Sequence, residues 1–232
     1  MQDSTSTLSR TNTYGGATGP VLAGVNDGAT RVLRNTYALL ALTLLFSAAV
    51  ASAAVAFQWP APGLVLSLVG MFGLLYAVHK LQNSAWALAA VFALTGFMGW
   101  TIGPLLTHSL ALPGGAQTIA LALASTGVTF LTLSGYVLVT RRDFSFMGGF
   151  LLVGMVIALL AGIAAMLLQM PAMALAVSAM VALLSAGLIL FETSRIVQGG
   201  ESNYVLATVS LFVSVFNLFT SLLSLFGFGS ND

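Results

Sequence analysis

The stretch 204-YVLATVSLFVSVFNLFTSLLSLF-226 carries no charged residue. About 20 consecutive apolar residues are enough for a helix to cross the roughly 30 Å hydrocarbon core of a bilayer. Five of its polar residues are spaced by four, three, four and three, which gathers them on one helix face: Ser210, Ser214, Asn217, Ser221 and Ser224. The stretch therefore predicts a transmembrane helix with one polar face, which we call the polar seam.

Further apolar stretches lie upstream, separated by short connections. None of them contains Asp, Lys or Arg, and Glu192 is the single acid within any of them. With the stretch above, the candidate spans are 36–57, 61–78, 85–105, 116–139, 147–169, 173–194 and 204–226. The sequence thus predicts an all-α, polytopic membrane protein with seven transmembrane helices.

The basic residues fall on one side of this alternation. They precede the first span or lie between spans 2 and 3, 4 and 5, and 6 and 7: Arg10, Arg31, Arg34, Lys80, Arg141, Arg142 and Arg195. Short loops rich in Lys and Arg stay on the cytoplasmic side. We therefore expect a cytoplasmic N-terminus and, after an odd number of spans, Asp232 on the opposite side.

The composition excludes several classes of protein. Hydrophobic residues make up 58% of the chain and charged residues 6%, whereas an ordinary soluble domain carries about 25% charge. A net charge of +1 without a basic cluster argues against a nucleic-acid partner. The chain has no cysteine, which removes thiolate nucleophiles, disulfides and cysteine-based metal sites. No cofactor is indicated.

Residues 1–34 form the only sizeable stretch outside the predicted membrane domain, residues 35–228. The stretch is poor in large apolar residues and rich in glycine, so it buries too little surface to offset the entropy of ordering. We predict a disordered cytoplasmic tail. It is either a plain tether or a handle for a cytoplasmic partner, such as a protease that must seize an unstructured end.

The polar seam has two interpretations. A row of polar side chains within a membrane span must face protein or water, because lipid offers it no partners. The seam either forms hydrogen bonds between helices or lines a closed polar pathway through the bundle. Small residues such as Gly99 and Gly103 are expected to let helices approach closely, and Pro104 beside them is expected to loosen that helix end.

Glu192 also has two interpretations. It lies near the cytoplasmic end of its span, and Arg195 follows three residues later, within reach along one helix face. The two side chains either form a local ion pair, or Glu192 points toward the polar seam as a proton or cation site.

Catalysis is not indicated. No Asp lies in any span to build an aspartyl pair, and the motifs of metalloproteases and phosphate-binding loops are absent from the sequence. His79 and His108 are expected in loops on opposite sides of the membrane, so they cannot share a metal. We predict no catalytic residues and no metal ligands.

Several segments together resemble a known family. They are Arg34-Asn-Thr-Tyr37, Gly103-Pro-Leu-Leu106, Tyr136-Val-Leu-Val-Thr-Arg-Arg-Asp-Phe-Ser-Phe-Met-Gly-Gly149, Leu190-Phe-Glu-Thr-Ser-Arg195 and Gly199-Gly-Glu-Ser-Asn-Tyr204. The chain from Arg31 to Phe228 looks like the Bax-inhibitor (transmembrane BAX inhibitor motif) family. The resemblance implies a bundle whose last helix is central and enclosed by the other six.

The resemblance is closest to the bacterial branch that modulates the membrane protease FtsH. It implies a protein of the bacterial inner membrane with a periplasmic C-terminus, which acts on FtsH as an inhibitor or slowly processed substrate. The implied partners are the FtsH complex, with its associated membrane regulators, and the lipid bilayer.

The wider family implies an alternative, a pH-sensitive calcium or cation leak controlled by two acids. Carried over to this sequence, the first acid falls on Glu192 and the second on Ser214. The chain departs from the pattern at Ser214, since one of the two carboxylates has become a hydroxyl. A single acid cannot reproduce the coupled titration of a carboxylate pair.

Overall fold

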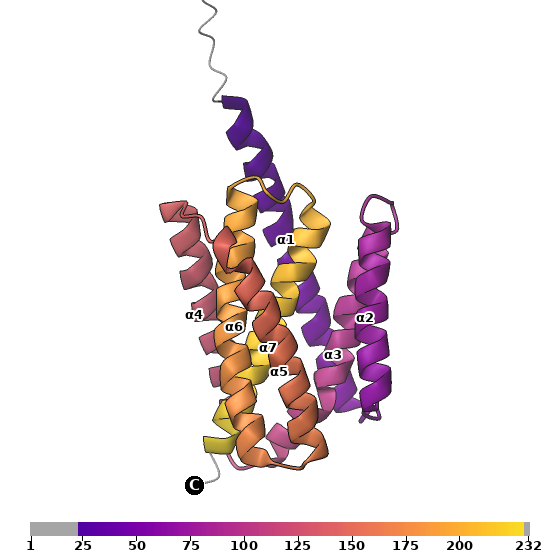
Figure 1. Ribbon diagram of the computed structural model, residues 1–232. Coiled ribbons are helices and arrows are strands. Elements are labelled where there is room, and N and C mark those ends of the chain that lie inside the picture. Colours follow the sequence, from indigo (N-terminus) through magenta and orange to yellow (C-terminus); the bar gives the residue numbers. More distant parts are fainter. Residues whose placement is uncertain (1–22, 230–232) are drawn as a thin grey trace, which may run out of the picture.

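The computed structural model describes residues 23–229, and every regular element in that range is helical. Seven of the helices are long and apolar enough to cross a membrane, as the hydropathy pattern predicts. The elements are α1 (Ala23–Ala56), α2 (Leu64–Leu81), α3 (Ala87–Ala111), α4 (Gly115–Thr140), η1 (Ser145–Met147), α5 (Gly148–Leu167), α6 (Pro171–Val197) and α7 (Tyr204–Gly229). They run up and down through one bundle (Figure 1).

The first helix begins earlier than the sequence suggested. α1 starts at Ala23, so residues 23–34 of the expected tail are helical. No proline interrupts the chain between Ala23 and Ala56, and Val32 and Leu33 pack against the main core. Burial of these side chains stabilises the extra turns. The rest of the predicted tail, residues 1–22, lies outside the described range.

The third helix also differs from expectation at its end. α3 continues through Pro104 to Ala111, although proline was expected to loosen the helix there. The Thr107 hydroxyl donates to the Gly103 carbonyl at 3.0 Å within this last part of α3. His108 consequently lies in the last turn of α3, and His79 in the last turn of α2, so the prediction that both occupy loops was wrong.

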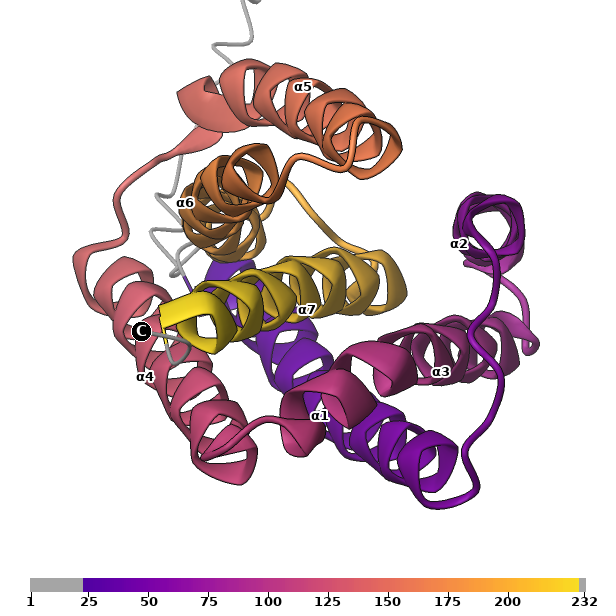
Figure 2. The same ribbon diagram turned by 90° about the horizontal axis from the view of Figure 1, so that it is seen from below.

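The last helix occupies the centre of the bundle. α7 packs against α1, α3, α4 and α6, while α5 packs on the outside of α6 and α2 on the outside of α3 (Figure 2). Phe212 and Leu211 of α7 are fully buried among core side chains from α1, α3 and α6. A central last helix is confirmed, but four helices, not six, surround it, because α2 and α5 form an outer layer.

Glycines bring α1 and α3 into close contact. A Cβ atom added at Gly99 would collide with the backbone carbonyl of Ser47, and one added at Gly103 would meet the Ala54 side chain at 2.9 Å. The expected role of these two glycines in helix packing is therefore seen between α1 and α3.

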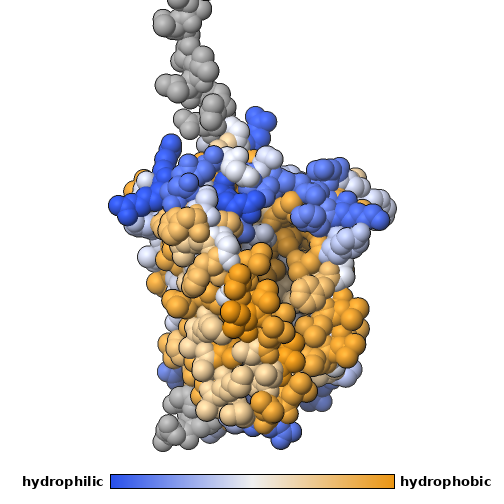
Figure 3. Space-filling view, in the orientation of Figure 1, coloured by the Kyte–Doolittle hydropathy of each residue, from blue (hydrophilic) through white to orange (hydrophobic). Residues whose placement is uncertain are grey.

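The surface separates into an apolar band and a polar end. Hydrophilic residues gather at the end of the bundle where α1 begins, above a broad hydrophobic band (Figure 3). Large apolar side chains such as Leu45 and Val139 are exposed on the sides of the bundle, where lipid would cover them. α7 ends at the opposite end from the start of α1 (Figure 1).

Candidate functional site

The polar end is organised by the turn between α6 and α7. Gly199 adopts a left-handed conformation with φ of 75°, which most side chains disfavour. The Gly199 and Gly200 amides donate to the carbonyls of Ile196 and Arg195 at 3.1 and 2.9 Å, closing the end of α6. The chain reverses there, so residues of the turn fold back over the last turn of α6.

Arg195 lies between two carboxylates. Its Nη1 atom is 3.4 Å from Glu192 Oε2, and its Nη2 atom is 3.1 Å from Glu201 Oε2. The side chains of Glu192 and Glu201 are only 10% and 13% exposed, against 34% for Arg195. The guanidinium carbon also lies 5.6 Å from the centroid of the Phe191 ring, a favourable cation–π distance. Glu192 thus faces its own helix neighbour Arg195.

The end of α6 is also fixed to the loop after α4. The Ser194 hydroxyl donates to the Arg142 carbonyl at 3.1 Å and accepts the Phe144 amide at 3.0 Å. One turn later, Gln198 Nε2 donates to the Arg141 carbonyl at 2.9 Å. These bonds give the backbone of the loop hydrogen-bond partners, which a segment without regular structure otherwise lacks. We call this arrangement the loop clamp.

Two neighbouring contacts support the loop clamp. The hydroxyls of Thr193 and Ser134 lie 3.3 Å apart between α6 and α4, and both residues are buried. Within the loop, the hydroxyl and then the amide of Ser145 donate to Asp143, and these bonds lower the pKa of its carboxyl group. Asp143 is therefore charged at neutral pH and holds the start of η1.

Asn203 connects the start of α7 to a third segment. Its Oδ1 atom accepts a hydrogen bond from the backbone amide of Val205 at 2.9 Å, as a helix-capping side chain does. Its backbone amide donates to the carboxylate of Glu201. Its Nδ2 atom lies 3.4 Å from acceptors of Gln82 and Asn83 in the turn between α2 and α3. One asparagine thus joins α7, the α6–α7 turn and the α2–α3 turn.

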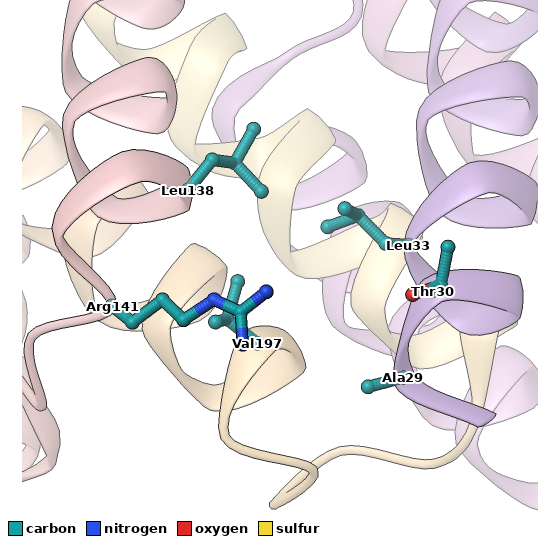
Figure 4. A pocket seen from close by; sticks show the side chains of 6 residues that line it. All are labelled: Ala29, Thr30, Leu33, Leu138, Arg141 and Val197. Carbon is teal, nitrogen blue, oxygen red and sulfur yellow. The ribbon is translucent and has the colours of Figure 1, made fainter. Parts of the chain in front are cut away.

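A small cavity of about 80 Å³ opens beside this network, between α1, α4 and α6. Figure 4 shows the Arg141 side chain reaching from the end of α4 toward Val197 of α6, with Thr30 and Leu33 of α1 opposite. Arg141 has a left-handed backbone with φ of 50° and ends α4. Arg31, Arg34 and Arg142 are exposed at the same end.

The polar seam is mostly turned into the bundle. Ser214 and Ser221 are buried, while Ser210, Asn217 and Ser224 are half-buried. The hydroxyls of Ser214 and Ser224 donate to carbonyls one turn earlier in α7, at 2.9 Å each. A bond from α7 to another helix comes from outside the seam, where the buried Thr208 hydroxyl donates to the Thr36 carbonyl of α1 at 3.3 Å.

Within residues 23–229, no hydrogen bond joins Glu192 to Ser214. Glu192 lies five residues before the end of α6, and Ser214 lies ten residues after the start of α7. These two helix ends belong to the same end of the bundle (Figure 1), so the two residues differ in depth by roughly 7.5 Å at 1.5 Å per residue. A shared proton or cation site at this pair stays a prediction.

Sequence reasoning missed most of the polar end. Glu201 and Asn203 carry signals that are visible in the chain, since each lies between the Gly199-Gly200 turn and an apolar helix, where capping residues occur. Ser194 carries none, because its partner loop is about fifty residues away in the sequence. Chemically, the assembled groups offer hydrogen bonds and charges of both signs to a binding partner.

Comparison with known proteins places the chain in a family. The profile described as "Inhibitor of apoptosis-promoting Bax1" matches residues 29–231. The chain is 50% identical over 202 residues to "Modulator of FtsH protease YccA" of Escherichia coli K12, covering 87% of this chain and 92% of that protein. "Inner membrane protein YccA" of E. coli O6:H1 is equally similar.

A further relative, from Pseudomonas aeruginosa, is 48% identical over 201 residues, covering 87% of this chain and 90% of the relative. The printed name "Inner membrane protein" agrees with the apolar helices described above. The chain is therefore a membrane-spanning member of the Bax-inhibitor family, similar to YccA.

Proposed function

We propose that this protein binds the membrane protease FtsH and slows its proteolysis, being itself processed slowly. The observation that carries the proposal is the similarity, along nearly the whole membrane domain, to a protein named as a modulator of that protease. The role is one of binding, and a partner in the same membrane fits the seven apolar helices of this chain.

The polar end supports the proposal as the surface that meets the protease. The start of α1 projects beyond the other helices there (Figure 1), and residues 1–22 precede it. The loop clamp and Asn203 hold three connecting segments at this end in fixed positions. A preformed surface loses less entropy on binding than a flexible one. We infer that residues 1–22 are the handle and that the polar end is the docking surface.

The same inference sets the orientation in the membrane. Within residues 23–229, all Lys and Arg residues lie toward the polar end, among them Arg34, Lys80 and Arg142. Short loops of this kind stay cytoplasmic. We propose that the polar end and the N-terminus face the cytoplasm and that the C-terminus is periplasmic, in the inner membrane.

The test is reconstitution of FtsH in liposomes with and without this protein. We expect the two to co-purify and the degradation of a membrane-protein substrate to slow when this protein is added. A variant lacking residues 1–22 should be degraded more slowly by FtsH than the full chain, because the handle is gone. A variant with these residues replaced by Gly and Ser at equal length separates the effect of length from that of sequence.

Two results would decide against the proposal. If the protein neither co-purifies with FtsH nor changes the degradation rate, the modulator function is wrong. If the protein slows FtsH but removal of residues 1–22 leaves its own half-life unchanged, only the handle is wrong. Thermal unfolding of the truncated protein in detergent serves as the control for folding.

A further inference from the structure

A second and larger cavity lies in the other half of the bundle. Its volume is about 370 Å³, and α1, α3, α4 and α7 form its walls. The residues Ile102 and Leu106 place it toward the end of α3, and Ile119 and Leu123 toward the start of α4, far from the polar end. It is therefore separate from the candidate site described above.

The cavity offers little to water or to a charged ligand. Among the described residues, no charged side chain lines it. Three residues with a hydroxyl group line the cavity, and two of these hydroxyls already form hydrogen bonds within their own helices. The Thr126 hydroxyl donates to the Ala122 carbonyl at 2.7 Å, and the Ser52 hydroxyl donates to the Ala48 carbonyl at 2.8 Å. Ser47 is the third. A buried water needs about three polar partners, so this wall favours an apolar occupant.

The cavity is also open toward the lipid. Leu123 lines it and is 56% exposed, and Ala48 and Ser52 are exposed on the α1 side. α1 and α4 both pack against α7 (Figure 2). Residues of both helices line the cavity. These helices cross the membrane, so hydrocarbon chains surround the opening.

Size distinguishes between the apolar occupants. An apolar cavity of about 150 Å³ holds a molecule as large as benzene, and this one is more than twice as large. A helix from another protein is about 10 Å across and about 5.4 Å long per turn, so a single turn already exceeds this volume. A flexible hydrocarbon chain is narrow enough. We propose that the cavity binds one acyl chain of a membrane lipid, inserted between α1 and α4.

Gly127 provides the means of testing this. It lines the cavity, and a Cβ atom added there would meet no atom within 4 Å. Gly127→Leu therefore fills the cavity without a collision at the first carbon, and Gly127→Ala fills it only in part. Gly135 is the matched control, because it lies on the same helix, has the same free space and does not line the cavity.

The experiment uses the full chain in liposomes that contain a phospholipid with a photoreactive group in one acyl chain. We expect adducts on residues 119–130 and 212–219 in the unmodified protein and in Gly135→Leu. The yield should fall in Gly127→Ala. In Gly127→Leu it should fall to the level found on the outer face of α5, which carries exposed side chains such as Phe150 and Leu152.

A second measurement does not depend on labelling. Addition of phospholipid to delipidated protein in detergent should raise the melting temperature of the unmodified protein and of Gly135→Leu more than that of Gly127→Leu. Equal labelling and equal stabilisation in all variants would overturn the proposal. So would a photoreactive residue at position 123 that captures a protein in cells and no lipid.

Discussion

At the scale of single residues, Arg195 takes part in two ion pairs. It balances Glu192 and Glu201, and both carboxylates are nearly buried. A charged group that loses its partner in such surroundings keeps its desolvation cost and gains nothing in return. Without Arg195, Glu192 would lose its ion-pair partner, and of its described partners Glu201 would keep only the backbone amide of Asn203.

Arg195→Gln should destabilise the protein by about 1–3 kcal/mol, the usual cost of leaving a buried polar group without its partner. Thermal unfolding in detergent measures the effect. Arg142→Gln is the control, since Arg142 is exposed and enters the network through its backbone carbonyl. The double variant Glu192→Gln with Arg195→Gln should regain part of the loss. Equal stability of Arg195→Gln and Arg142→Gln would show that the ion pairs contribute nothing.

The sequence alone predicts only some of the contacts between these side chains. The spacing of Glu192 and Arg195 on one helix face made their contact foreseeable, because it is local. The contact of Arg195 with Glu201 depends on the left-handed turn at Gly199, and the loop clamp depends on how α4 and α6 lie together. Such contacts follow from tertiary packing, which hydropathy and spacing do not encode.

At the scale of elements, the contact between α1 and α3 depends on small side chains. A Cβ atom added at Gly99 would meet the backbone of α1, which cannot move aside as a flexible side chain can. Hydropathy predicts both helices, since their apolar length is a local property. It does not predict that they are neighbours, nor that α1 extends back to Ala23.

Gly99→Ala should therefore destabilise the bundle by about 1–3 kcal/mol, the usual cost of overpacking. Gly73→Ala in α2 is the matched control, because a Cβ atom there meets nothing within 4 Å, and alanine favours the helix by up to about 1 kcal/mol over glycine. Melting temperatures of the two variants in detergent should move in opposite directions. A stable Gly99→Ala would mean that α1 and α3 separate more easily than their packing indicates.

At the scale of the whole molecule, the start of α1 and the end of α7 lie at opposite ends of the bundle (Figure 1). The hydropathy pattern predicts this arrangement through the odd number of spans. The central position of α7 came from the family resemblance, because its polar seam alone does not say which helices surround it. Only the orientation in the membrane depends on the basic residues.

Reporter fusions at Ser9 and after Asp232 should give opposite results, with the first active in the cytoplasm and the second in the periplasm. The physical reason is the retention of basic loops on the cytoplasmic side. A fusion in the α6–α7 turn, after Gly200, is an internal control and should report the cytoplasm. Two cytoplasmic reports from the termini would contradict the crossing of α7.

The place of α1 in the bundle determines how the molecule resists mechanical force. A pull on the N-terminus acts first on α1, and α1 packs on α3, α6 and the central α7. The outer helices α2 and α5 come later in the chain, and each packs mainly on one neighbouring helix. A motor that pulled from this end would therefore have to break the extensive packing of the first helix before it reached the weakly packed outer helices.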